Sequence, residues 1–172
     1  YMFNGTLIVY SASSTNNQDN NSAIDFETEC EIHGGTLLAL GAYTGMTQTP
    51  TSDSTQPYVA FGSSSSSLSF SSVCTLKVST TTSTANAIYT YVSTVSGKTI
   101  GHVVYSSPSL SSNTTYYLLI DGTNKKSAKS STPSTASAIT ASKFTVTTGN
   151  EEYTGSAVTK TITTTLTQYS EY

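Results

Sequence analysis

The sequence lacks arginine and tryptophan, and it contains only 7 lysines among 172 residues. The 10 acidic residues outnumber these lysines and give a net charge of −3 at pH 7. Because a surface that binds nucleic acid needs clustered positive charge, we expect no nucleic-acid partner. The chain also has no apolar run of about 18 residues, so we expect no membrane span.

Helical patterns are missing as well. No amphipathic stretch reaches about ten residues, and the composition is dominated by serine and threonine, with 12 tyrosines. Threonine and tyrosine favour strands, whereas clustered serines favour loops and turns. The sequence therefore predicts an all-β protein.

The motifs of common catalytic sites are absent too. There is no Gly-x-Ser-x-Gly motif and no Cys-x-x-Cys pair. The only histidines, His33 and His102, stand in strand-like sequence, where a structural histidine is commoner than a general base. We therefore do not expect an enzyme.

The two cysteines, Cys30 and Cys74, leave two interpretations open, an extracellular disulfide or two buried free thiols. Three Asn-x-Ser/Thr sequons, at Asn4, Asn20 and Asn113, are candidate glycosylation sites. So serine- and threonine-rich a chain would contain about this many by chance.

Residues 22–41 carry the strongest pattern in the chain. In the first half of this segment, carboxylates alternate with apolar or small residues, which predicts a strand with one acidic face made of Asp25, Glu27, Glu29 and Glu31. Gly34-Gly35 then interrupts the strand, and a second strand is expected at residues 36–40.

This second strand repeats an earlier one. The segment 5–9 (GTLIV) aligns with the segment 35–39 (GTLLA), so that Gly5 corresponds to Gly35. We call the spacing between these two glycines, 35 − 5 = 30 residues, the repeat offset. A strand and glycine bend that recur at a fixed offset are typical of stacked coils in a parallel β-helix. We therefore predict that residues 1–57 form terminal coils of a right-handed parallel β-helix and a crossover.

Residues 58–172 show a different pattern, namely strands of alternating polarity separated by turn residues. This pattern predicts an antiparallel β-sandwich-like region. We expect residues 122–137 to be a flexible or extended surface segment. The expected strands are 58–61, 68–78 with a bulge near Ser71-Ser72, 87–95, 100–105, 115–120, 143–147 and 159–167.

Several motifs resemble one known family. They are SAIDF at 22–26, IHGGTLLALG at 32–41, GM at 45–46, STQ at 54–56, VYSSPSL at 104–110 and TYY at 115–117. In this order they resemble the C-terminal half of bacterial carbohydrate-binding parallel β-helix proteins, relatives of a polygalacturonate-binding β-helix protein. The resemblance spans residues 3–122. It implies a β-helix end with an antiparallel β cap, sugar binding and bound calcium.

The acidic row is the candidate metal site. Calcium prefers several oxygen ligands, which Asp25 and Glu27 could supply together with Asp19 and the neighbouring Asn20 or Asn21. The competing interpretation is a solvated acidic face that keeps a β surface soluble.

Tyrosines and lysines are the candidate sugar-binding residues. An aromatic ring stacks on the apolar face of a pyranose, which suggests Tyr43, Tyr89 and Tyr91. An anionic polymer would also need cations, and Lys125 and Lys126, with Lys129, form the one cluster. The alternatives are tyrosines that cover the sandwich and lysines in a solvated loop.

Taken together, these patterns favour a non-catalytic, extracellular or cell-surface module that binds a polysaccharide. The alternative is a structural subunit of a surface filament. A β-helix coil buries its interior only by stacking, and the sequence opens within a coil, as if excised from a longer chain. Self-association would then use the N-terminal coil, or donation of the C-terminal strand 159–167 to a neighbour.

Overall fold

The computed structural model describes residues 1–10, 23–42, 48–62, 68–70, 74–93, 98–135, 140–146 and 164–170. The described elements are strands, apart from one short 3₁₀ turn at Thr84–Asn86, which confirms the all-β prediction. The chain forms two compact units, Tyr1–Thr135 and Ala136–Tyr172, and each is described by itself.

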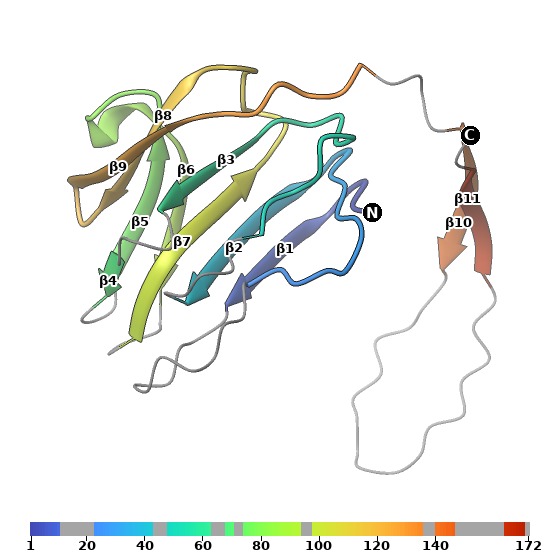
Figure 1. Cartoon of the computed structure of the whole chain (residues 1–172), viewed down its shortest axis with the longest axis horizontal. Coiled ribbons are helices and arrows are strands. Elements are labelled where there is room, and N and C mark those ends of the chain that lie inside the picture. Colours follow the sequence, from blue (N-terminus) through green and yellow to red (C-terminus); the bar gives the residue numbers. More distant parts are fainter. Residues whose placement is uncertain are drawn as a thin grey trace, which may run out of the picture. The chain divides into compact units, whose positions relative to one another are not determined.

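The first sheet of the larger unit mixes parallel and antiparallel pairing (Figure 1). Its strand order is β1 (Thr6–Tyr10), β2 (Thr36–Ala42), β7 (Lys98–Ser106) and β3 (Tyr58–Gly62), and β4 (Leu68–Phe70) also pairs with β7. Strands from both sides of residue 57 therefore share one sheet.

The predicted repeat is confirmed at this sheet. β1 and β2 are parallel, with Thr6 opposite Thr36 and Tyr10 opposite Leu40, which is the predicted offset. Met2 and Ile32 form a parallel bridge at the same offset. Gly5 and Gly35 have nearly the same left-handed φ, +89° and +85°. These contacts establish one repeat and not a complete β-helix.

The second sheet is wholly antiparallel, as expected of the sandwich-like region. Its strand order is β6 (Ala87–Ser93), β5 (Cys74–Ser79), β8 (Thr115–Ile120) and β9 (Thr123–Lys129). The expected single strand over 68–78 is wrong, because β4 and β5 lie in different sheets. Both strands alternate in polarity, and alternation does not reveal which sheet a strand joins.

Within the first sheet, β2 is covered on both faces. One face packs against the second sheet, where Leu38 and Leu40 of β2 share a core with Leu76 and Leu118. On the other face, Leu37, Ala39 and Val104 pack with Ile32, partly buried Met2 and Ile24. Residues 37–40 are at most 1% exposed, so β2 is the central strand of a three-layered arrangement.

The expected acidic strand before Ile32 is absent, since residues 23–31 form bends and irregular backbone. Phe26 exchanges two hydrogen bonds with the side-chain amide of Gln48, at 2.7 and 3.2 Å. The Cys30 carbonyl accepts from the N–H and the hydroxyl of Thr51. These partners satisfy the backbone groups without a strand ladder.

The residues of the Ser54-Thr55-Gln56 motif hold this segment in place. Ser54 accepts a hydrogen bond from the Ile32 N–H at 3.1 Å. The buried Gln56 amide donates to the Gly35 carbonyl and to Ser106 on β7, at 3.0 and 2.8 Å. The motif therefore connects the coil to β7.

Both cysteines are free thiols, which answers the question left open by the sequence. Cys74 lies in the core between the sheets, and Cys30 packs against the opposite face of the first sheet. Burial, with a smaller contribution from Asp121, raises the pKa of the Cys74 thiol to about 11. Cys74 is therefore protonated at neutral pH.

The smaller unit contains one antiparallel pair, β10 (Thr140–Val146) and β11 (Thr164–Ser170). Each overlaps a strand expected from the sequence, at 143–147 and 159–167.

The two equivalent glycines allow backbone strain to be separated from coil contact. A Cβ at Gly35 would lie 2.7 Å from the Gly5 carbonyl oxygen, whereas a Cβ at Gly5 meets nothing within 4 Å. Gly5→Ala should cost about 1–2 kcal/mol of unfolding free energy, because both positions have left-handed φ. Gly35→Ala should cost about 1–3 kcal/mol more, because the contacted atoms are backbone. Urea titration of both variants measures this difference, and equal losses would contradict close packing of the repeat.

Candidate functional site

Three short stretches of the larger unit run alongside one another: residues 1–3, 30–33 and 51–56. Met2 donates to the Glu31 carbonyl at 2.9 Å and accepts from His33 at 2.7 Å. The Gln56 N–H donates to the Ile32 carbonyl at 3.0 Å. Since Met2 and Ile32 pack inward, alternation directs their neighbours to the opposite side. We call this side the coil face, which comprises Tyr1, Phe3, Glu29, Glu31, His33 and Thr55.

Three rings stack on the coil face. Phe3 and His33 lie 4.8 Å apart between centroids, with planes 12° apart. Tyr1 is 6.2 Å from each of them and nearly parallel to both. Phe3 and His33 are separated by the repeat offset, so their stacking follows from the pairing of the two coils. The Tyr1 side remains open, because Tyr1 is 59% exposed.

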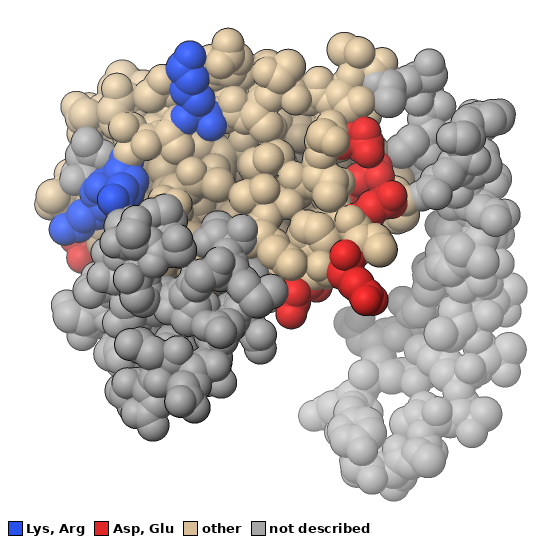
Figure 2. Space-filling view, viewed as in Figure 1, with Lys and Arg blue, Asp and Glu red and all other residues tan. Residues whose placement is uncertain are grey.

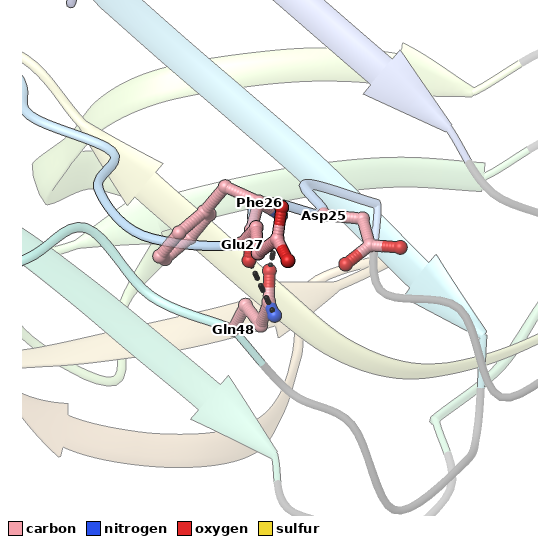
Figure 3. Close-up of a pocket in the computed structure, with 4 residues that line it drawn as sticks. All are labelled: Asp25, Phe26, Glu27 and Gln48. Carbon is pink, nitrogen blue, oxygen red and sulfur yellow. Dashed lines mark hydrogen bonds between the residues drawn. The ribbon is translucent and has the colours of Figure 1, made fainter.

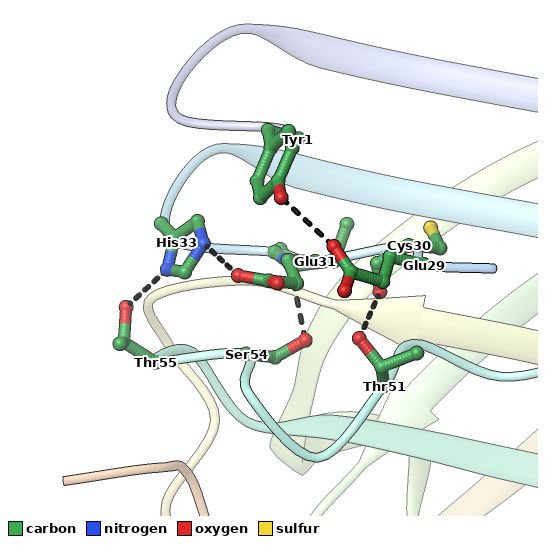
Figure 4. Close-up of polar contacts among 9 residues, drawn as sticks. Tyr1, Glu29, Cys30, Glu31, His33, Thr51, Ser54 and Thr55 are labelled. Atoms are coloured by element: carbon green, nitrogen blue, oxygen red, sulfur yellow. Dashed lines mark hydrogen bonds and ion pairs between the residues drawn. The ribbon is translucent and has the colours of Figure 1, made fainter. Parts of the chain in front are cut away.

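A chain of polar contacts surrounds these rings (Figure 4). The Tyr1 hydroxyl donates to Glu29 at 2.8 Å. His33 contacts Glu31 through Nε2 at 2.7 Å and Thr55 through Nδ1 at 2.9 Å. An ionised carboxylate only accepts, so Nε2 carries the proton, and in the neutral ring Nδ1 accepts from Thr55. Both ring nitrogens are therefore bonded, as the structural interpretation of His33 expects.

The acidic row is not one solvated face. Glu31 is only 8% exposed and accepts a hydrogen bond from His33, whereas Asp25, Glu27 and Glu29 are exposed. A buried carboxylate needs such a partner because burial removes its hydration. The solvated interpretation is thus wrong for Glu31.

Asp25 and Glu27 line an open pocket of about 440 Å³ together with Phe26 and Gln48 (Figure 3). The structure therefore brings together two of the three predicted metal ligands. Asp19 lies outside the described residues, as does Asn20.

The described lining of the pocket contains two carboxylates. Asp25 and Glu27 are the charged residues that line the pocket. The side-chain carbonyl oxygen of Gln48 accepts a hydrogen bond from the Phe26 N–H. Within the described part of the chain, no three His, Cys, Asp or Glu side chains group closely enough to hold a metal. Calcium prefers six to eight oxygens.

The predicted tyrosines are not assembled into an exposed platform. Tyr89 and Tyr91 are half-buried on β6 and pack against the core between the sheets. Tyr89 lies 4.8 Å from the ring of Tyr105 in a tilted arrangement, and burial raises its pKa. Tyr43 lies outside the described residues.

The predicted lysines lie on a strand. Lys125 and Lys126 belong to β9, so their placement in a loop is wrong; β9 pairs with β8 through most of its length. Lys125 is exposed and Lys126 is half-buried. In Figure 2 the lysines lie away from most of the acidic side chains in view, and one acidic side chain adjoins them.

Two of the three sequons lie in the described part of the chain, and both asparagines are exposed. The Asn4 side chain accepts from the Gly5 N–H at 2.7 Å. Asn113 has a left-handed φ of 50° and contacts Lys129 at 3.5 Å. Asn4 and Asn113 therefore remain accessible candidates for glycosylation.

Sequence reasoning missed Tyr1 and Phe3. The signal that finds Phe3 is the repeat itself, because Phe3 and His33 occupy equivalent positions in the two coils. No described helix is long and apolar enough to cross a membrane. Comparison with family models, with curated proteins and with solved structures found no match to this chain.

The His33–Glu31 pair can be tested by a double-mutant cycle. His33→Ala should cost about 1–3 kcal/mol of unfolding free energy, because it leaves a buried carboxylate without its partner. In a Glu31→Gln background the same change should cost less, since an amide is cheaper to leave unpaired. Equal costs in both backgrounds, measured by denaturant titration, would show that the pair has no net coupling.

Proposed function

We propose that this protein is a non-catalytic module that binds a polysaccharide at the coil face. The observation that carries the proposal is the cluster of three nearly parallel rings, in which Tyr1 is 59% exposed, beside the exposed carboxylate of Glu29. Aromatic rings stack on the apolar face of a sugar ring, and carboxylates accept strong hydrogen bonds from its hydroxyls. An extracellular or cell-surface location fits such a ligand.

We also propose that residues 1–57 are terminal coils of a right-handed parallel β-helix. Support comes from the parallel pairing of β1 with β2 and from the Met2–Ile32 bridge at the same offset. The resemblance to carbohydrate-binding β-helix proteins points to the same fold and the same class of ligand. In this arrangement the coil face lies on the outer side of a stacked corner.

Binding should depend on the exposed ring of Tyr1 and on the half-buried ring of Phe3. Tyr1→Ala and Phe3→Ala should each weaken polysaccharide binding about three- to tenfold, because a ring contact contributes about 0.5–1.5 kcal/mol. Calorimetry or affinity electrophoresis against pectic, β-glucan and starch polymers measures this loss, with calcium and with a chelator. If calcium is bound, the chelator should also lower the melting temperature.

The matched control is Val92→Ala on β6, which removes another exposed apolar side chain, 56% exposed, from outside the coil face. This variant should bind as the parent chain does. Failure of every polymer to bind, in either condition, would rule out the proposed function.

A second candidate function is that of a structural subunit in an extracellular filament. The observation that favours it is the outer edge of β1, which pairs only with β2 among the described residues. Leu7 and Ile8 on β1 are 49% and 43% exposed, and a hollow of about 180 Å³ opens beside Leu7 and Val9. The strand has no charge, no proline and an uninterrupted register, so it lacks the usual protection against pairing.

The other edge of β2 is occupied by β7. The β1 edge of one molecule therefore cannot stack onto β2 of a second molecule, because β7 already occupies that edge of β2. Donation of a C-terminal strand to the β1 edge of a neighbour avoids this obstacle, and such head-to-tail contacts do not close on themselves. The second candidate thus takes the form of strand donation.

Assembly should be sensitive to charge on β1. Ile8→Lys and deletion of residues 159–172 should each reduce oligomers to monomers, because one blocks the edge and the other removes the donor. Light scattering and negative-stain imaging measure assembly, with Val92→Lys as the control for an added surface charge. Monomers of the unmodified chain at every concentration would exclude this candidate.

A further inference from the structure

We propose that the coil face selects neutral polysaccharides over polymers of uronic acids. The inference rests on the proposed polysaccharide binding and adds the chemical class of the ligand. It follows from the charge around the rings and from the way the hydrogen-bond donors of the face are used.

Among the described residues before Lys77, the exposed acidic and basic side chains are all acidic. No lysine or arginine precedes Lys77 in the sequence, and Asp25, Glu27, Glu29 and Asp53 are exposed in the described residues of that part. The lysine cluster lies instead on β9, in the second sheet. In Figure 2 most of the acidic side chains in view lie away from the lysines, although one acidic side chain adjoins the lysines at the left. A polyanion that reaches the coil face therefore meets like charge at short range.

The hydrogen bonds of the face add a second reason. The Tyr1 hydroxyl donates to Glu29, His33 Nε2 donates to Glu31, and in the neutral ring the Thr55 hydroxyl donates to Nδ1. The three donors are thus directed to protein acceptors. The exposed carboxylate among the side chains of the coil face is that of Glu29, and a carboxylate only accepts.

A ligand for such a surface must bring its own donors. The hydroxyls of a neutral sugar donate to carboxylates, and the apolar face of the sugar stacks on Tyr1. A uronate carboxylate only accepts, so it forms no hydrogen bond with Glu29 and its charge is repelled. Both effects act in the same direction.

The test compares the full chain with a neutral β-glucan or mannan panel and with polygalacturonate of matched length, in the presence of a chelator. At low ionic strength, the best neutral polymer should bind at least about tenfold more tightly than polygalacturonate. The ratio should shrink at high salt, because salt screens the repulsion. Tyr1→Ala should weaken binding of the neutral polymer.

Charge variants identify the origin of the selectivity. Glu29→Gln should lower the ratio of neutral-polymer affinity to polygalacturonate affinity several-fold, because the substitution removes a negative charge and adds a hydrogen-bond donor. Ser127→Lys, at an exposed position of β9, changes the net charge by the same amount and should leave the ratio unaltered.

The outcomes separate the two proposals. If no polymer binds, the proposed function fails. If polygalacturonate binds as tightly as the best neutral polymer in chelator, or if the ratio is indifferent to Glu29→Gln, the selectivity is overturned while polysaccharide binding stands. Neutral binding that survives Tyr1→Ala unchanged would place the ligand elsewhere and overturn the inference as well.

Discussion

Burial of β2 on both faces is the constraint on which the larger unit depends. Leu38 and Leu40 face the core shared with the second sheet, and Leu37 and Ala39 face the layer that contains Ile32. One edge of β2 sets the register of β1, and the other pairs with β7. The coil face follows from this arrangement, because Ile32 must pack inward for Glu31 and His33 to lie on the other side.

The close approach of β7 to β2 requires a particular residue. A Cβ at Gly41 would overlap the ring of His102, which is 1% exposed. Gln56 adds a second connection, since its amide bonds both the Gly35 carbonyl and Ser106 of β7. Gly41 thus leaves room for His102 at one end of the β2–β7 pairing, and Gln56 bonds Ser106 at the other end.

Much of the strand content could be predicted, because strand polarity alternates wherever one face is buried. The repeat offset predicted the register of β1 and β2 correctly, since the aligned glycines adopt the same conformation and the strands that follow them pair in parallel. The failures have local causes. The carboxylates of residues 25–31 alternate like a strand, yet Gln48 and Thr51 satisfy the backbone instead. Local alternation also does not reveal long-range pairing. β4 pairs with β7, for example, and does not continue into the sheet that contains β5.

The candidate site was only partly accessible from sequence. Asp25 and Glu27 line one pocket, although the strand from which the sequence grouped them is absent. Tyr89 and Tyr91 were singled out for their shared face, and that face packs on the core. Composition alone does not distinguish the two faces of a strand. The ring cluster of the coil face was not predicted, because Phe3 and His33 are distant in sequence and only the repeat offset shows that they are neighbours.

The antiparallel cap formed by β7 has a consequence for repeat number. Since β7 closes one edge of β2, whole repeats can be gained or lost only beyond β1, and the core between the two sheets is untouched by such changes. Each added repeat with an aromatic residue at the position of Phe3 and His33 would lengthen the row of rings by one. For the proposed polysaccharide ligand, avidity would then follow the number of repeats rather than the chemistry of any single contact.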